Sequence, residues 1–151
     1  MAAGFQAAFD RTQVEREVML VLDAFLTAFN RQDARAEANT YHFPHFRLAN
    51  GQMSAWDGPG PEIDAWMSGT YKALRESGWN HSAWTRRRIV HILDSKAHVD
   101  IEFTRYRKDG AVIASIESLY IVTKEDGRWG IKMRSSFDRT IAAPGDRRNS
   151  R

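Results

Sequence analysis

The chain has 151 residues, a formal net charge of +3 and no cysteine. This length is typical of one domain with a normal hydrophobic core, and the lack of cysteine excludes disulfides and thiolate metal sites. No apolar run approaches the ~18 residues that a membrane-spanning helix needs, and the N-terminus lacks the layout of a signal peptide. We therefore expect a cytoplasmic protein with no membrane partner.

The positive charge is concentrated near the C-terminus, where the residues after Ile141 include three arginines and one aspartate. The rest of the chain is nearly neutral, which argues against a nucleic-acid partner. The run Arg86-Arg87-Arg88 is not a nucleic-acid patch either, because alternation along a strand sends its members to opposite faces. The sequence leaves open whether Arg87 or its two neighbours point inward.

The N-terminal part of the chain predicts two helices. Thr12 and Glu15 form a capping-box pattern, which predicts a helix that runs to about Arg31, and Asp33 can cap a short second helix through Asn39. The expected buried stripe of the first helix is Val14, Val18, Leu22, Phe25 and Phe29. The expected organisation is one domain between two flexible tails, at residues 12–140, 1–11 and 141–151 respectively.

A hairpin and a third helix are expected next. Residues 41–46 are interpreted as a turn that leads into a short strand at 46–49. Asn50-Gly51 predicts a hairpin turn into a second strand. Pro61 is well placed as the first residue of the third helix, and Gly78 ends it. The expected buried stripe of this helix is Ile63, Trp66, Met67, Thr70 and Leu74.

Four consecutive antiparallel strands are expected after Gly78, the first at about residues 82–93. Asp109-Gly110 and Asp126-Gly127 are strong hairpin signals, because a type I′ turn needs a positive φ at both central positions. If Asp109-Gly110 closes a two-residue loop, the pairs are Ala97–Val122, Val99–Tyr120, Ile101–Ser118 and Phe103–Ile116. The second loop likewise predicts the pairs Val122–Ile131, Tyr120–Met133, Ser118–Ser135 and Ile116–Phe137.

These pairings predict one mostly apolar face and one mostly polar face, because side chains alternate along a strand. The apolar face, which we expect to point inward, comprises Ala97, Val99, Ile101, Phe103, Ile116, Ser118, Tyr120, Val122, Trp129, Ile131, Met133 and Phe137. On the opposite face, Glu117 and Arg134 are expected to pair diagonally. The other residues of that face are His98, Asp100, Glu102, Thr104, Ser115, Leu119, Ile121 and Lys132.

Helices followed by consecutive strands indicate an α+β fold. The chain resembles the nuclear transport factor 2-like superfamily, the cone-shaped fold of ketosteroid isomerase, scytalone dehydratase and the SnoaL-like polyketide cyclases. The resemblance covers residues 12–138, and its carriers are the helix end at 25–33, Gly78-Trp79-Asn80-His81-Ser82, and Asp126 to Ile131 with Ser135-Ser136. It implies a curved sheet wrapped over the helices, an apolar pocket, a homodimer formed through the sheet, and chemistry that needs no cofactor.

Enzymes of this kind move a proton next to a carbonyl and hold the developing oxyanion with a hydrogen-bond donor. The candidates for the base are His42, His45, His81 and Asp138. The resemblance places His42 and His45 near the pocket mouth, although either could equally be a loop histidine bonded to backbone. Pro44 spoils helical spacing between them and no third ligand is evident, so we expect no metal site.

Tyr120 is the candidate donor to the oxyanion, with a core tyrosine as the alternative. The resemblance to SnoaL-like cyclases implies an acid–base role for a residue near Asp138, and a one-residue offset on the strand would change the face on which Asp138 lies. The candidate substrate contacts are Trp84, Phe103, Arg105, Ser118, Met133 and Ser135. Arg105 could meet an anionic group of the substrate or reach solvent.

The leading functional hypothesis is a cofactor-independent isomerase, dehydratase or cyclase that acts on a small, largely apolar carbonyl compound. Steroid isomerase activity is disfavoured, because no carboxylate lies near Ala49-Asn50, where the resemblance implies the general base. The alternative is a non-catalytic module of the same fold that binds a small ligand or dimerises. A third possibility is protein interaction through the outer face of the sheet.

Overall fold

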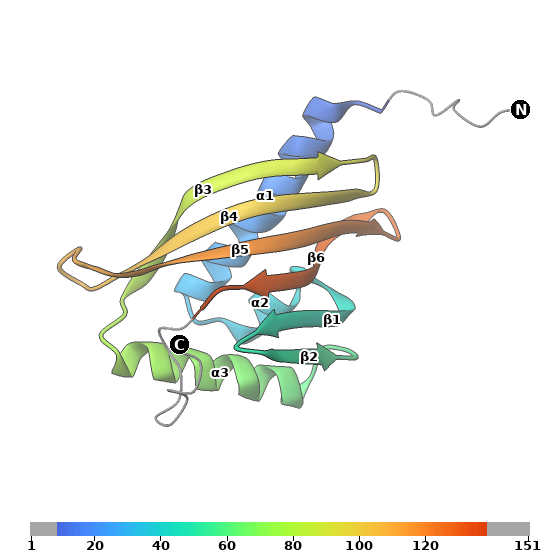
Figure 1. Ribbon diagram of the computed structural model, residues 1–151. Coiled ribbons are helices and arrows are strands. Elements are labelled where there is room, and N and C mark those ends of the chain that lie inside the picture. Colours follow the sequence, from blue (N-terminus) through green and yellow to red (C-terminus); the bar gives the residue numbers. More distant parts are fainter. Residues whose placement is uncertain (1–8, 139–151) are drawn as a thin grey trace, which may run out of the picture.

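The computed structural model describes residues 9–138. The predicted tail at 141–151 and most of the predicted tail at 1–11 therefore lie outside the described residues. The chain is α+β, as predicted, with helices first and a meander of strands last (Figure 1). The elements are α1 (Arg11–Asn30), α2 (Ala34–Ala38), β1 (Tyr41–Ala49), β2 (Gln52–Trp56), α3 (Pro61–Glu76), β3 (His81–Ile92), β4 (Lys96–Tyr106), β5 (Val112–Glu125) and β6 (Arg128–Ser136).

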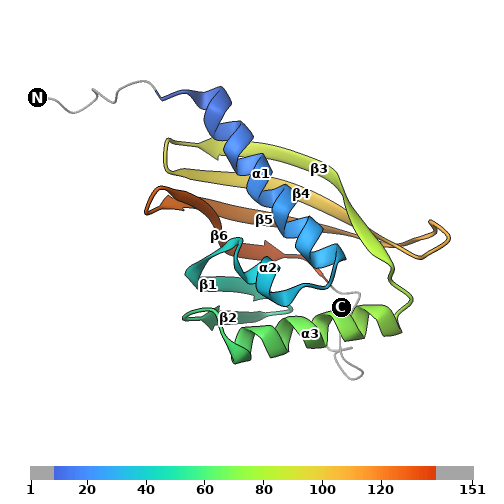
Figure 2. The same cartoon turned by 180° about the vertical axis from the view of Figure 1, so that it is seen from behind.

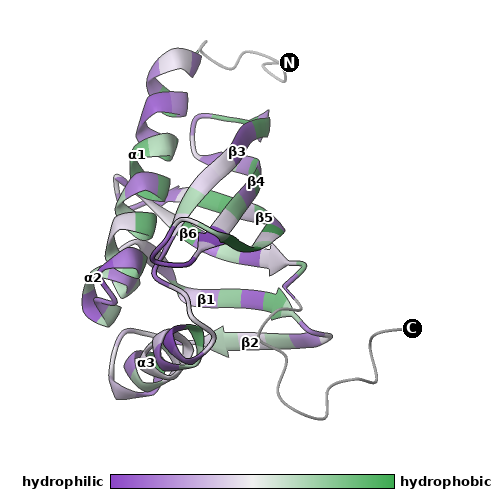
Figure 3. Ribbon diagram, turned by 90° about the vertical axis from the view of Figure 1, so that its left-hand side faces the viewer, coloured by the Kyte–Doolittle hydropathy of each residue, from purple (hydrophilic) through white to green (hydrophobic). Residues whose placement is uncertain are grey.

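All six strands form one curved sheet in the order β2-β1-β6-β5-β4-β3. Strand β1 runs parallel to β6, and the other neighbours are antiparallel. Seen from behind, α1 crosses the long strands diagonally while α3 lies near β1 and β2 (Figure 2). The three helices cover one side of the sheet (Figure 3). The inner face of the sheet is the side that packs on these helices, and the outer face is the opposite side.

Helix α1 begins slightly earlier than the capping-box pattern indicates. Asp10, not Thr12, is the N-cap residue, and its side chain accepts a hydrogen bond from the Gln13 N–H at 3.1 Å. The predicted buried stripe is confirmed except at its end, where Ala28 is buried and Phe29 is only partly so. Asp33 caps α2 as predicted, through the N–H of Ala36.

The predicted turn at residues 41–46 is wrong, because β1 already begins at Tyr41. Tyr41 pairs with Ile131 of β6, and the ladder between these two strands is irregular until Phe46 pairs with Met133. Parallel pairing with β6, which joins segments far apart in sequence, therefore extends the strand through Pro44. The Asn50-Gly51 hairpin is confirmed, since both residues have a positive φ.

Helix α3 begins at Pro61 and ends before Gly78, both as predicted. Gly78 has a φ of +90°, and the Trp79 N–H bonds the Leu74 carbonyl beyond it, which is a glycine-dependent helix ending. The buried face differs in part, because Tyr71 is buried whereas Trp66 and Thr70 are half-buried.

The predicted register between β4 and β5 is confirmed at all four pairs. The loop itself differs from the prediction. Arg107 and not Lys108 is bonded to Ala111, so the loop has three residues, and only Gly110 has a positive φ. A bulge at Ile113 follows, where Arg105 pairs with Ala114 but Tyr106 pairs with Val112. The longer loop and the bulge cancel, and the register of the rest of the hairpin is unchanged.

The predicted register between β5 and β6 is correct only next to the turn. Asp126 and Gly127 both have a positive φ, and Val122 pairs with Ile131, as predicted. Ile121 then pairs with Met133, so Lys132 is an extra residue that forms a β-bulge. The predicted Tyr120–Met133, Ser118–Ser135 and Ile116–Phe137 pairs are therefore wrong, and Tyr120 pairs with Arg134 while Ser118 pairs with Ser136.

This bulge reverses the side-chain faces of the second half of β6, because a shift of one residue exchanges the two faces of a strand. Arg134 and Asp138 are buried, at 6 % and 4 % exposure, whereas Phe137 is 75 % exposed. Met133 and Ser135 lie on the outer face and are not inner-face residues. The predicted Glu117–Arg134 pair is also wrong, since Glu117 lies beside Arg86.

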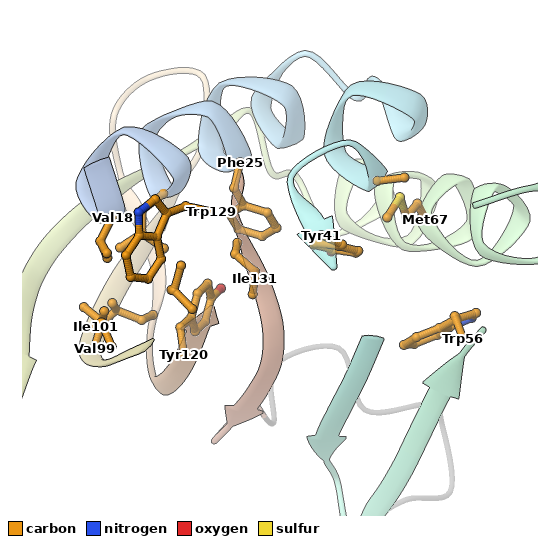
Figure 4. Close-up of a cluster of buried hydrophobic side chains, with 14 of the residues drawn as sticks. Val18, Phe25, Tyr41, Trp56, Met67, Val99, Ile101, Tyr120, Trp129 and Ile131 are labelled. Carbon is orange, nitrogen blue, oxygen red and sulfur yellow. The ribbon is translucent and has the colours of Figure 1, made fainter. Parts of the chain in front are cut away.

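The arginine run of β3 is divided between the faces. Arg86 and Arg88 lie on the outer face, where both pair with Asp100. Arg87 points to the inner face and pairs with Asp23 of α1 at 2.6 Å. The core between sheet and helices is rich in aromatic rings from α1, β1, β5 and β6 (Figure 4). Among the described helices, none is long and apolar enough to cross a membrane.

Candidate functional site

Arg134 is the centre of a buried polar cluster on the inner face. The bulge at Lys132 places it in one cross-strand row with Tyr120 and Arg47. Its guanidinium lies over three aromatic rings, with the carbon atom Cζ at 5.1, 5.5 and 5.9 Å from the ring centres of Tyr41, Phe25 and Trp66. A cation held over aromatic faces is favourable, more so when it is desolvated.

The hydrogen bonds of Arg134 are incomplete within the described residues. Its Nε donates to Nε2 of His45 at 3.3 Å, and the guanidinium also interacts with the Tyr120 hydroxyl. Its Nη2 is buried and has no hydrogen-bond partner among residues 9–138. A buried donor left unpaired costs about 1–3 kcal/mol, and more when it is charged. A donor of this kind needs an acceptor, which an ordered water, an ion or a ligand can supply.

Glu37 is a buried carboxylate whose charge acts on this cluster, and it was not singled out from the sequence. It is 1 % exposed and accepts hydrogen bonds from the hydroxyls of Tyr41 and Tyr71, at 2.6 and 2.7 Å. Burial raises the pKa of Glu37, while the charge of Arg134 and the tyrosine hydroxyls oppose that rise. Both carboxylate oxygens are thus committed to donors inside the protein.

His45 is fully buried, and both of its ring nitrogens are used. Nδ1 donates to the Ile131 carbonyl at 2.9 Å, which leaves Nε2 as the acceptor for Arg134. The ring is stacked on Tyr41, with centroids 3.7 Å apart and planes at 4°. Burial, followed by the charge of Arg134, lowers the pKa of His45 to about 2. His45 is therefore neutral and orients Arg134.

The other two histidines that the sequence offers as candidate bases lie apart from this cluster. His42 Nε2 donates to the Arg128 carbonyl at 2.8 Å, and its Nδ1 accepts from the Arg128 guanidinium. The ring lies against Gly130, where a Cβ would approach it to 2.8 Å. His81 stacks on Tyr106 and bonds Asn80 at the start of the edge strand β3. His42 is thus a histidine bonded to backbone, the alternative that the sequence left open, and His81 is packed at the edge of the sheet.

Tyr120 is placed as predicted, on the inner face and 1 % exposed. Its ring meets Phe25 and Trp84 edge-on, with centroids 5.8 and 6.0 Å apart. Burial raises the pKa of Tyr120, and the neighbouring charge of Arg134 partly offsets the rise. The hydroxyl is therefore protonated at neutral pH and can donate a hydrogen bond. The indole Nε1 of Trp84, also a predicted contact residue, is buried without a partner among the described residues.

Ser118 is on the inner face as predicted, but its partner differs. Its hydroxyl contacts the Ser136 hydroxyl at 2.6 Å and donates to the Ser135 carbonyl at 2.8 Å. The predicted Ser118–Ser135 pair is thus replaced by Ser118 and Ser136, because the β6 bulge exchanges the positions of the two serines.

Asp138 and Arg105 form a buried ion pair. Nη2 of Arg105 lies 2.8 Å from Oδ2 of Asp138, and Nη1 lies 3.4 Å from Oδ1, so the guanidinium bridges both carboxylate oxygens. Both side chains are under 5 % exposed. The Arg105 guanidinium lies over Phe103 at 5.4 Å. Asp138 is therefore held by a cation, and Arg105 does not reach solvent.

The polar inner face could be predicted only in part from the sequence. Four residues of this cluster were not predicted as site residues from the sequence: Arg47, Glu37, Tyr41 and Arg134. One available signal was the spacing of Glu37 and Tyr41, four positions apart across the end of a helix, which is compatible with contact. Within residues 9–138, no group of three or more histidine, aspartate or glutamate side chains could hold a metal ion.

The sequence matches one family model over residues 16–135, and that model is described as NTF2-like protein (DUF6841). No curated protein matches the sequence. An NTF2-like protein of unknown function from Shewanella oneidensis has a similar structure, with a TM-score of 0.64, 20 % identity, and coverage of 83 % of this chain and 99 % of that one.

Two further solved structures show the same architecture. A protein of unknown function with a cystatin-like fold from Nostoc punctiforme has a TM-score of 0.67 at 13 % identity, over 87 % of this chain and 94 % of that chain. A ketosteroid isomerase-like protein from Erwinia carotovora has a TM-score of 0.60 at 20 % identity, over 85 % and 97 % of the two chains. Similarity at this level of identity concerns the fold alone.

Proposed function

The chain belongs to the NTF2-like protein (DUF6841) family, and from that premise we propose that it binds a small, largely apolar molecule through an oxygen atom that accepts hydrogen bonds from Arg134 and Tyr120. The observation that carries this proposal is the buried Nη2 of Arg134, which no described residue accepts a hydrogen bond from. The aromatic rings around it supply the apolar contacts that small-molecule sites commonly use.

Binding is better supported than proton-transfer catalysis, our leading hypothesis from the sequence. Tyr120 and Arg134 suit the stabilisation of an oxyanion, but each candidate base is engaged in other contacts. His42 and His81 are engaged elsewhere, and His45 donates through Nδ1 while its Nε2 accepts from Arg134. Asp138 is held by Arg105. The non-catalytic alternative is therefore the function that this geometry favours.

The test is ligand-dependent thermal stability of the full chain, with probes that differ in the oxygen atom. Acetophenone, phenylacetamide and phenylacetate carry an acceptor, and ethylbenzene is an apolar control without one. We expect at least one oxygen-bearing probe to raise the Tm by several degrees, as ligand binding to the folded state requires, and ethylbenzene to raise it much less.

Variants link the effect to the site. Arg134→Met should abolish the preference for the oxygen-bearing probe, and Tyr120→Phe should weaken it. Arg88→Met is the matched control, because that arginine is 72 % exposed on the outer face. The proposal is wrong if no probe at millimolar concentration changes the Tm of the unmodified chain, or if Arg88→Met and Arg134→Met behave alike.

A further inference from the structure

Two guanidiniums converge on one aromatic ring at the edge of the buried cluster. Arg47 and Arg134 are paired neighbours on β1 and β6. Their Cζ atoms lie 5.4 and 5.9 Å from the ring centre of Trp66 on α3. Both Arg47 and Trp66 are half-buried, so this is where the polar cluster comes nearest to the surface.

The buried carboxylates already have donors at both oxygens. Glu37 accepts from two tyrosine hydroxyls, and Asp138 is bridged by Arg105. The ion pairs formed among residues 9–138 include neither Arg47 nor Arg134. Three arginines therefore share this region with two carboxylates, and the pair without an ion-pair partner is the one beside Trp66.

The charge of Arg134 acts against the charge of Arg47. Burial, followed by the charge of Arg134, lowers the pKa of Arg47, and Asp138 only partly compensates. Like charges that remain close at the rim of an apolar interior are stabilised when an anion lies between them. A carboxylate matches a guanidinium in geometry as well as in charge, since both are planar and can form two parallel hydrogen bonds.

We infer that the ligand of this site is a monoanion, and that its carboxylate lies between Arg134 and Arg47 while its apolar body packs on the neighbouring aromatic rings. This inference rests on the proposed function. It narrows the class of ligand from any oxygen-bearing apolar molecule to aryl or alicyclic carboxylates. Arg105, which the sequence suggested for an anionic group, is occupied by Asp138 and is not the anion site.

The experiment compares an acid with its own primary amide, which has nearly the same shape and no charge. Binding of 4-fluorophenylacetate and of 4-fluorophenylacetamide to the full chain is measured by fluorine NMR titration. We expect the acid to bind about tenfold more tightly or better, because hydrogen bonds to a charged partner are stronger than neutral ones. Arg47→Gln and Arg134→Gln should each remove most of this preference, and Arg88→Gln should leave it unchanged.

Each outcome distinguishes this inference from the proposed function. If the amide binds as tightly as the acid, the ligand is not selected by charge, and the anion inference is wrong while small-molecule binding stands. If the acid is preferred but Arg88→Gln removes the preference as well, the effect is general electrostatics and the assignment to Arg47 and Arg134 is wrong. If neither probe binds at millimolar concentration, aryl carboxylates are excluded as ligands. The anion inference then fails, whether or not acetophenone raises the Tm in the test of the proposed function.

Discussion

At the scale of single residues, a buried histidine and a buried arginine determine each other's state. His45 accepts a hydrogen bond from Arg134 and donates one to the Ile131 carbonyl. A proton on the accepting nitrogen would place two positive charges 3.3 Å apart in an interior that cannot solvate them. His45 thus behaves as a neutral structural side chain, although histidine was the natural candidate for a base.

The first prediction concerns pH. Folding depresses the pKa of His45 from 6.5 to about 2, so between those values the unfolded chain binds a proton that the folded chain does not. The neutral His45 ring thus contributes to the unfolding free energy. This contribution is fully present above pH 6.5 and is lost as the pH falls towards 2, by about 1.4 kcal/mol per pH unit. His45→Asn keeps a donor near the Ile131 carbonyl and should lack this dependence.

Urea unfolding of the two proteins at about pH 7 and pH 5 checks the prediction. The raised pKa of Glu37 makes the unfolding free energy change with pH in the opposite direction. Glu37 is present in both proteins, so the difference between their pH dependences isolates the contribution of His45. Equal losses of unfolding free energy on acidification would show that His45 is protonated in the folded state.

At the scale of elements, two hairpins explain what the sequence could and could not predict. Alternating apolar residues and a turn motif are local signals, and they place β4 and β5 correctly. Their hairpin nevertheless contains two irregularities, a three-residue loop and a bulge at Ile113, whose effects on the register cancel. The hairpin of β5 and β6 has a single irregularity, at Lys132, and nothing cancels it.

No local signal announces the bulge at Lys132, because Ile131 and Met133 alternate as inward residues of a regular strand would. What decides the register lies elsewhere in the chain. When Arg134 points inward, it donates a hydrogen bond to His45 of β1, and the negative charge of Glu37 on α2 stabilises its positive charge. These partners are about 90 positions away in sequence, so the polar site depends on tertiary contacts that the alternation of one strand cannot reveal.

The second prediction tests the bulge by deletion. Removing Lys132 should give a regular ladder in which Ile131, Met133 and Arg134 keep their present faces. Within the described part of the chain, the Lys132 side chain makes two hydrogen bonds of 3.4 Å, to the Phe43 carbonyl and to Glu125, and partly exposed pairs contribute little. We expect a loss of no more than about 1–2 kcal/mol in unfolding free energy.

Deletion of Ser135 is the matched control, since it also shortens β6 by one residue. It should turn Ser136 and Asp138 to the wrong face and break the buried pair with Arg105, at a loss of about 3–5 kcal/mol. Urea unfolding of both variants gives the comparison. Equal destabilisation by the two deletions would contradict the assignment of Lys132 as the extra residue.

At the scale of the whole molecule, no helix among residues 9–138 covers the outer face of the sheet, and this face is divided in two. Charged residues on β3, β4 and β5 form a network around Arg86, which contacts Asp100, Glu102 and Glu117. The other half is mostly apolar. Apart from Ser135, its outer-face residues on β2, β1, β6 and β5 include Met53, Ala55, Phe46, Leu48, Met133, Phe137, Leu119 and Ile121.

The third prediction concerns association. We propose that two copies of the chain pair through this apolar half, because a two-fold axis brings the same patch of each copy together. Leu48→Glu, on the outer face and 37 % exposed, should shift the chain from dimer to monomer in light scattering coupled to size exclusion. Leu20→Glu, 61 % exposed on α1, should leave the mass unchanged. A monomeric parent chain would refute the proposal.

The bulge at Lys132 has a consequence for how such a protein can change over time. The register of the strand after the bulge determines two surfaces together, since the half-strand that presents Arg134 and Asp138 to the interior also presents Met133 and Phe137 to the outside. A shift of this half-strand by one residue cannot alter one of these surfaces and spare the other. Relatives in which this half of β6 is shifted by one residue should therefore differ in both the inner and the outer surface, whereas point substitutions let the two surfaces diverge separately.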